Sequence, residues 1–388
     1  MTARLPLPRE AAFTSRLRSP AVAARVGAVL GVCFAVCFVT GIISHWAQLP
    51  RPAVPFPTSP AWGYRVTQGL HVTTGIACVP LLLVKLWTVY PRLFAPVPKG
   101  ARRLLLTTLE RASIGVLVAS AIFQLATGLA NAARWYPWES FSFRTTHFAI
   151  AWVAIGALLV HIAVKLPVIR AAFGADVDDT ALDRPSATVP GPVSRRWLLR
   201  STWIATGVAV VATVGNTVPW LRGVSVLSVR SGDGPGGIPI NTSARRADVV
   251  ATAMSASYRL VLVNGDRAVY LTREDLLAMT QRSEKLPIAC VEGWSASGTW
   301  SGVRFRDLLD LVDAPRGAHV RITSLQPKGA YRRTDLPSNF ADDDRTLLAL
   351  GLNGETLAPD HGYPARLIAP NRPGVLQTKW VSRIEVVA

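Results

Sequence analysis

The stretch LPIACVEGW, residues 286–294, contains Cys290, the one cysteine in the C-terminal half of the 388-residue chain. The other three cysteines, Cys33, Cys37 and Cys78, lie in apolar surroundings within the first hundred residues. Cys290 therefore has no partner within its own half for a structural disulfide.

Three explanations for Cys290 remain open on residue chemistry alone. In the first, Cys290 is an inert buried thiol, the commonest state of a lone cysteine. In the second, it is a nucleophile with His319 or His361 as base, as in cysteine transpeptidases. In the third, it is a metal ligand, because a thiolate binds soft metals firmly.

The composition indicates a protein that lies partly in a membrane. Mean hydropathy is +0.29 and only 17% of residues are charged. The net charge of +18 could indicate nucleic acid. Much of the arginine flanks the apolar segments, however, so membrane topology explains the charge better and no nucleic-acid partner is expected.

Five apolar stretches approach the roughly 20 residues that cross a bilayer. We expect helices at about 22–44, 65–88, 109–131, 146–168 and 198–220. Residues 1–221 are thus predicted to form an all-α bundle of five transmembrane helices in membrane lipid. The first stretch is too long for a cleavable signal peptide.

Basic residues predict the orientation of this multi-pass cell-membrane protein. They are concentrated in the N-terminal tail and in the second–third and fourth–fifth connections. The positive-inside rule then places the N-terminus in the cytoplasm, and five crossings place the C-terminal domain outside the cytoplasm.

Histidines in the bundle are candidate metal ligands, since ionisable residues within a membrane are costly and commonly functional. His71 and His147 fall at the same predicted depth on different helices, so they can ligate haem iron from both sides. His161 lies 14 residues after His147, about 21 Å further along one helix face. It has no histidine partner at that depth, so one haem b is expected and a second is doubtful. His45, at a helix end, is either a ligand or an interfacial residue.

This histidine pattern resembles the di-haem cytochrome b subunits of formate dehydrogenases and hydrogenases over roughly residues 22–170. In that family, histidines 14 apart on the fourth helix pair with histidines of the first two helices. The first-helix histidine of the inner haem is missing here.

Residues 194–200 read SRRWLLR before an apolar segment, which resembles a twin-arginine export signal. The alternative is the ordinary accumulation of arginine in a cytoplasmic loop. The export interpretation matters because that route carries domains that are already folded.

The C-terminal part is predicted to be an α+β domain at 239–388, after a Gly/Ser-rich linker at 222–238. Short β-rich runs alternate with turn signals, including Asn264-Gly265 and Asn353-Gly354. Two short helices are expected, at 273–279 and 305–312.

Three ordered blocks of this domain together resemble the molybdopterin-binding domain of the sulfite oxidase family. They are CVEGW at 290–294, TWSGVRFRDLL at 299–309 and HGYPARLIAPNRPGVLQTKWVSRIEV at 361–386. The branch of periplasmic methionine sulfoxide reductase catalytic subunits is the most similar. The resemblance implies that Cys290 is the thiolate on molybdenum and that Glu292 lines the substrate pocket.

The same resemblance implies a set of residues that approach the pterin and its phosphate. They are Gly362, Pro364, Arg366, Lys379 and Asn241, the last in IPINTS. Arginine and lysine suit a phosphate, and Arg372 in the stiff PNRPG loop is a further candidate. The immunoglobulin-like dimerisation domain of the sulfite oxidase branch is not expected after residue 388.

These patterns together predict a membrane-bound, molybdopterin-dependent oxidoreductase. It transfers an oxygen atom to or from a small substrate of the sulfoxide, N-oxide or sulfite class. Haem b exchanges electrons with the quinone pool or another partner. The alternatives are a membrane-anchored cysteine transpeptidase or hydrolase using Cys290 and His361, and a sensor that has lost the metal.

Overall fold

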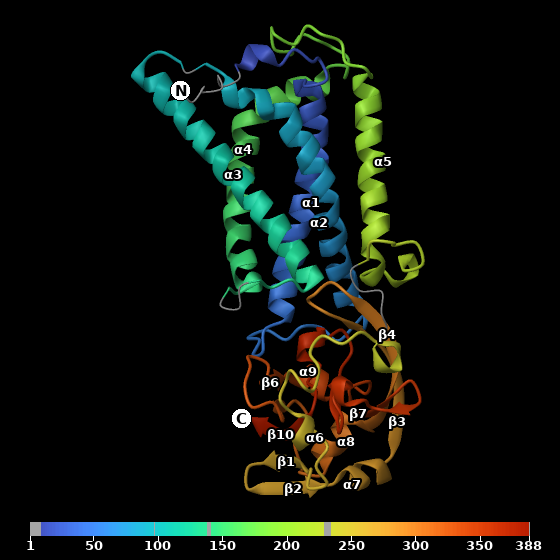
Figure 1. Cartoon of the computed structure of the whole chain (residues 1–388). Coiled ribbons are helices and arrows are strands. Elements are labelled where there is room, and N and C mark those ends of the chain that lie inside the picture. The colour runs from blue at the N-terminus through green and yellow to red at the C-terminus, as the bar shows by residue number, and fades with distance from the viewer. Residues whose placement is uncertain (1–8, 97, 138–140, 229–233, 388) are drawn as a thin grey trace, which may run out of the picture. The chain divides into compact units, whose positions relative to one another are not determined.

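The computed structural model describes residues 9–96, 98–137, 141–228 and 234–387, and it divides into two compact units (Figure 1). The first unit comprises residues 1–39, 71–214 and 224–227. The second comprises residues 40–70, 215–223 and 228–388. Residues 229–233 of the predicted linker lie outside the described part of the chain.

Five long helices account for most of the N-terminal half, and each is long and apolar enough to cross a membrane. They are α1 (Pro20–Ala47), α2 (Gly63–Val89), α3 (Ala101–Ala133), α4 (Phe143–Gly174) and α5 (Arg195–Thr213). The five predicted spans are thus confirmed as helices. Most of them extend beyond the apolar core of the span, because polar residues at the ends continue the same backbone hydrogen bonding.

The helix α5 ends at Thr213, earlier than the sequence suggested, and two short 3₁₀ turns follow at Val214–Asn216 and Pro219–Leu221. Gly215 disfavours helix through its backbone freedom, and Pro219 lacks a backbone donor. The chain therefore leaves the helix before residue 220, and residues 215–223 join the second unit.

The second unit is an α+β domain built on two five-stranded sheets. The first sheet has the order β2-β1-β10-β5-β6, in which β1 and β10 are parallel. The second has the order β3-β4-β7-β8, with β9 paired to β7. The strands are β1 (Leu260–Asn264), β2 (Arg267–Leu271), β3 (Gln281–Ala289), β4 (Ser295–Arg304), β5 (His319–Ser324), β6 (Arg333–Leu336), β7 (Leu347–Leu352), β8 (Glu355–Thr356), β9 (Arg366–Ile368) and β10 (Val381–Val387).

Short helices connect these strands: α6 (Val250–Ala253), α7 (Arg273–Ala278), α8 (Phe305–Asp310) and α9 (Ser338–Ala341). The two helices expected from sequence correspond to α7 and α8. At the β7–β8 hairpin, Asn353 and Gly354 have φ of 51° and 86°. The positive φ at both central positions is the conformation that an Asn-Gly hairpin turn requires.

The connection between α1 and α2 is part of the second unit and contributes to its core. Phe56 and Tyr64 are buried in the cluster that joins the two sheets. The Asp335 amide donates to the Pro50 carbonyl at 2.7 Å, and Asn339 Nδ2 donates to the Phe56 carbonyl at 2.9 Å. The domain therefore includes residues that lie about 200 positions before its strands in the sequence.

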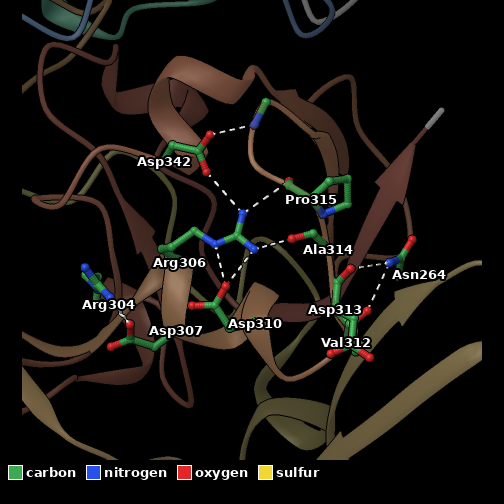
Figure 2. Close-up of polar contacts among 11 residues, drawn as sticks. Asn264, Arg304, Arg306, Asp307, Asp310, Val312, Asp313, Ala314, Pro315 and Asp342 are labelled. Atoms are coloured by element: carbon green, nitrogen blue, oxygen red, sulfur yellow. Dashed lines mark hydrogen bonds and ion pairs between the residues drawn. The ribbon is translucent and has the colours of Figure 1, made fainter.

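A buried arginine holds α8 against the loop that leads to β5 (Figure 2). Arg306 is 1% exposed; its Nε donates to Asp310 Oδ1 at 2.8 Å and its Nη1 to Asp342 Oδ1 at 3.1 Å. The same guanidinium also donates to the carbonyls of Ala314 and Pro315. The buried guanidinium thus joins α8, the loop after it and Asp342 at one corner of the domain.

Replacing Arg306 by leucine should destabilise this domain by about 3 kcal/mol, because buried carbonyls and a carboxylate lose their donor. That loss corresponds to a fall of roughly 5–10 °C in the midpoint of thermal unfolding of the purified full chain. The control is Arg267→Leu, since Arg267 pairs with Asp313 at an exposed site and should cost under about 1 kcal/mol. Equal midpoints for the two variants would contradict a structural role for Arg306.

Candidate functional site: a buried thiol among cations

Cys290 lies in the turn between β3 and β4, which is fixed from several sides. Its amide donates to the Trp294 carbonyl at 2.8 Å, and the Gly293 amide donates to the Cys290 carbonyl at 3.0 Å. Thr217 Oγ1 donates to the Gly293 carbonyl. Arg65 Nε donates to Ser295 Oγ at 2.6 Å. The position of the thiol is therefore set by its own turn and by residues from two distant segments of the chain.

The thiol of Cys290 is buried beside a carboxylate. Cys290 is 1% exposed and packs in an apolar cluster with Ile288, Trp294 and Ile368. Its Sγ lies 3.7 Å from Glu292 Oε2, and the same oxygen accepts a hydrogen bond from Trp294 Nε1 at 3.2 Å. The indole thus holds the carboxylate next to the sulfur.

A buried guanidinium, that of Arg366 at the start of β9, lies in the same neighbourhood. Arg366 is 2% exposed; its Nη1 donates to the His361 carbonyl at 3.1 Å and its plane lies over the Trp300 ring at 5.2 Å. Burial lowers the pKa of Arg366 to about 9, and the nearby Cys290 thiol opposes this shift. Arg366 and Cys290 therefore act electrostatically on one another.

Lys379 adds a second buried cation. Its Nζ donates to the Thr242 carbonyl at 2.8 Å and to the Asp360 carbonyl at 2.7 Å. Burial lowers the pKa of Lys379 most strongly and Arg366 lowers it further, whereas Cys290, Asp360 and Glu292 raise it. The structure thus brings four of the residues expected from sequence, Cys290, Glu292, Arg366 and Lys379, into one electrostatic environment.

His361 belongs to this environment as a neutral residue. It is 1% exposed, and burial, followed by the charges of Arg366 and Lys379, lowers its pKa to about 4. The backbone at Pro235 and Ile238 opposes that shift only weakly. Among the described residues, none completes a hydrogen bond of regular geometry to either ring nitrogen. A neutral buried imidazole can donate or accept towards a bound polar group.

The backbone after His361 permits the close approach of both cations. Gly362 has φ of 110°, and a Cβ there would lie 3.1 Å from the Cβ atoms of Arg366 and of Lys379. Trp380, directly after Lys379, has φ of 54°, a strained value for a bulky residue. Strain of this kind is characteristic of functional sites.

Arg372 and Asn241 differ in their placement. Arg372 donates to the carbonyls of Leu376 at 3.1 Å and Asp335 at 3.0 Å and stacks on the Phe340 ring. The charged neighbour of Arg372 is Asp335, and none of these contacts joins Arg372 to Cys290. Asn241 Oδ1 accepts from the amide of Thr242, the residue whose carbonyl binds Lys379.

Two residues that position the Cys290 turn were not identified from sequence. Thr217 lies inside the helix expected at 198–220 and Arg65 at the start of the helix expected at 65–88, and neither carries a local signal of this role. Their role depends on contacts across more than 70 and more than 200 positions of the chain, respectively. No sequence motif around Thr217 or Arg65 predicts this positioning role.

In the first unit, His71 of α2 and His147 of α4 face one another. Their ring centroids are 6.2 Å apart. His71 Nδ1 lies 3.0 Å from the Cys37 carbonyl and His147 Nδ1 lies 2.8 Å from Thr127 Oγ1. A hydrogen bond at Nδ1 fixes the ring orientation, as is usual for histidines that bind a metal through the other nitrogen.

The other histidines of the bundle are not part of this pair. His161 lies on α4 near the charges of Lys85, Lys165 and Glu110. His45 is exposed near the end of α1. Within the described residues, no group of three or more His, Cys, Asp or Glu side chains forms a metal site made by protein alone.

Comparisons with known proteins bear on the C-terminal domain. Residues 247–388 match the family model of the oxidoreductase molybdopterin binding domain. Curated relatives include a putative protein-methionine-sulfoxide reductase subunit YedZ1 of Azospira oryzae, 32% identical over 36% of this chain and 52% of that protein. The protein-methionine-sulfoxide reductase catalytic subunit MsrP of Gluconobacter oxydans is 32% identical over 31% and 44%. Sulfite oxidase of Arabidopsis thaliana is 33% identical over 25% and 29%.

Residues 247–388 are therefore similar to oxidoreductase molybdopterin-binding domains, and the relatives include proteins of the sulfite oxidase type. The matched segments span about half of the length of these relatives or less. The predicted family resemblance and the α+β class of the domain are confirmed. The roles of individual residues stay predictions.

Replacing Gly362 by alanine should lower the molybdenum content of the purified full chain severalfold, because the added Cβ pushes Arg366 and Lys379 apart. Elemental analysis per chain measures the effect. Gly329→Ala is the matched control, since Gly329 has φ of 115° with nothing within 4 Å of the added carbon. A molybdenum content as high in Gly362→Ala as in the control would contradict the expected displacement of Arg366 and Lys379 by the added Cβ.

Proposed function

We propose that the chain is a membrane-bound molybdenum oxidoreductase that transfers an oxygen atom to or from a small substrate. The substrate would be of the sulfoxide, N-oxide or sulfite class, and electrons would be exchanged through haem b in the helical unit. One observation carries the proposal. In a domain of the molybdopterin-binding family, Cys290 is buried beside Glu292 within the field of Arg366 and Lys379.

The residues around Cys290 fit a molybdenum–pterin group. Buried nitrogen atoms with no regular hydrogen bond among the described residues include both ring nitrogens of His361, Nε of Arg366 and Nε1 of Trp300. Such atoms are costly unless a bound group satisfies them. Cys290 would hold the metal, and Arg366 and Lys379 would hold the anionic pterin phosphate, with Asn241 and Arg372 as further candidates. When bound, the group supplies oxygen-atom transfer and two-electron chemistry.

The side chains of the chain itself prepare the site for that group. The positive charges of Arg366 and Lys379 act on the sulfur of Cys290, as they would on any anionic ligand at this site. Near-complete burial keeps bulk water away from the sulfur and strengthens these interactions. Glu292, held by Trp294 Nε1, would orient a substrate donor next to the metal.

His71 and His147 would hold a haem b. Their ring centroids lie 6.2 Å apart, and a hydrogen-bond contact at Nδ1 orients each ring, which supports this assignment. His161 would be a ligand only if a second haem is bound. The group supplies one-electron transfer, and the electron partner would be the quinone pool or another donor or acceptor.

The predicted orientation places the molybdenum domain outside the cytoplasm. The basic connections support that topology, and the SRRWLLR stretch would be the export signal. Within the folded chain, Arg195 pairs with Asp183, and Arg196 pairs with Asp176 at 2.6 Å and Asp178 at 2.8 Å. These arginines therefore also hold the connection between α4 and α5 in place.

No observation favours the transpeptidase or hydrolase alternative. The Cys290 thiol lies beside the Glu292 carboxylate, which is a weaker base than a neutral imidazole. The family match also concerns a cofactor-binding domain.

Replacing Cys290 by serine should lower turnover at least about a hundredfold, because loss of a ligand exceeds the effect of losing its supporting residues. The reduction of methionine sulfoxide or trimethylamine N-oxide by dithionite-reduced viologen measures this activity. Cys33→Ser is the matched control and should keep both its molybdenum and its turnover. Full turnover in Cys290→Ser would contradict the proposed role of Cys290 as a metal ligand.

Replacing His71 by alanine should abolish the reduced b-type absorption band of the detergent-purified chain, since one axial ligand is lost. The optical spectrum after dithionite reduction is the measurement, and His45→Ala is the histidine control. An unchanged band in His71→Ala would refute this haem assignment. The molybdenum content should be the same in the wild-type chain, in His71→Ala and in His45→Ala.

A further inference from the structure

The helix α3 contacts His147 although it has no histidine of its own. Its side chains Gln124 and Thr127 are buried, and each lies within hydrogen-bond distance of His147 on α4. The two are three positions apart, so they lie on one face of α3. Polar groups inside a helix that is apolar enough to cross a membrane are costly and commonly functional. We therefore asked what these two contacts do for His147.

The two side chains hold different parts of His147. Gln124 Nε2 donates to the His147 carbonyl at 3.0 Å, which fixes the backbone of α4 at this position. Thr127 Oγ1 lies 2.8 Å from His147 Nδ1, which fixes the ring. A Cβ added at Gly128 would lie 3.6 Å from His147 Cε1, so the ring packs closely against α3. The orientation of His147 is thus set by a helix that supplies no haem ligand.

The proton of the Thr127 hydroxyl is used within α3. A threonine hydroxyl has one proton to donate and two lone pairs that accept. Thr127 Oγ1 donates that proton to the Phe123 carbonyl at 2.7 Å. Towards His147 the hydroxyl then acts as an acceptor, so the ring proton lies on Nδ1 and the Nε2 atom carries none.

His71 reaches the same protonation through a different partner. Its Nδ1 lies 3.0 Å from the carbonyl of Cys37, and a carbonyl only accepts. The Nε2 atoms of both rings are therefore without a proton, the form in which an imidazole binds a metal. The acceptor for His71 is backbone, whereas the acceptor for His147 is a side chain. The support of His147 can thus be removed by a single substitution.

We propose that Thr127 is a positioning residue that lowers the midpoint potential of the haem b held by His71 and His147. An imidazole that donates a hydrogen bond from Nδ1 is a more basic ligand at Nε2. A more basic ligand stabilises oxidised iron more than reduced iron, and hydrogen bonds to the ligands are one way in which a protein tunes a haem. This inference rests on the haem of the proposed function and deepens it.

A redox titration of the b-type absorption band of the detergent-purified full chain measures the midpoint potential. Thr127→Val keeps the shape of the side chain and both haem ligands, so the band should remain. The stability of oxidised relative to reduced haem should fall about tenfold, an upward shift of about 59 mV for one electron. Thr127→Ala also lacks the hydroxyl and should shift the potential in the same direction.

Two further variants separate the hydrogen bond from packing. Thr127→Ser keeps the hydroxyl and should keep the wild-type potential. Thr202→Val on α5 is the matched control, because Thr202 is also buried and donates to the carbonyl four positions earlier, that of Leu198 at 2.8 Å. It should leave the potential unchanged.

Unchanged potentials in Thr127→Val and Thr127→Ala, beside a normal wild-type band, would overturn the role of Thr127 alone. A shift in Thr127→Ser as large as in Thr127→Val would overturn it in favour of packing. A shift of the same size in Thr202→Val would overturn it in favour of a general effect of losing a buried threonine. A folded wild-type chain without a b-type band would overturn the haem of the proposed function together with this role.

Discussion

The burial of two cations next to a thiol and a carboxylate is the constraint on which the C-terminal domain depends. Arg366 and Lys379 are almost completely buried, and a buried charge is costly unless an opposite charge balances it. Cys290 and Glu292 raise the pKa of Lys379, and burial lowers it more. An anionic group bound at this site would supply the missing balance, and we propose that the phosphate of a pterin is this group.

The second constraint is that the domain cannot be separated from the chain around it. Residues 40–70 and 215–223 form one compact unit with the strands of the domain. Thr217 and Arg65 fix the turn that carries Cys290, and Phe56 and Tyr64 fill its core. Cutting the chain before residue 239 would therefore remove both core side chains and supports of the site.

Sequence patterns predicted the elements that depend on local composition. The length of the apolar runs predicted the five helices, and turn residues predicted the strands and the α+β class. The resemblance predicted Cys290, Glu292, Arg366 and Lys379 as site residues, and their roles stay predictions. The supports of the site were not predictable, because Thr217 and Arg65 act through contacts that only the folded chain creates. The apolar run predicted a helix that continues to residue 220, but α5 ends at Thr213. Gly215 and Pro219 disfavour helix there, and the mean hydropathy of the segment does not reflect the effect of single residues.

We propose that the sulfur of Cys290 binds molybdenum. X-ray absorption at the molybdenum edge of the purified full chain, made in cells that assemble the pterin, measures the sulfur atoms bound to the metal. We expect a thiolate sulfur in addition to the dithiolene sulfurs, and the loss of that one sulfur in Cys290→Ser. An identical sulfur shell in the two proteins, or a folded chain without molybdenum, would contradict it.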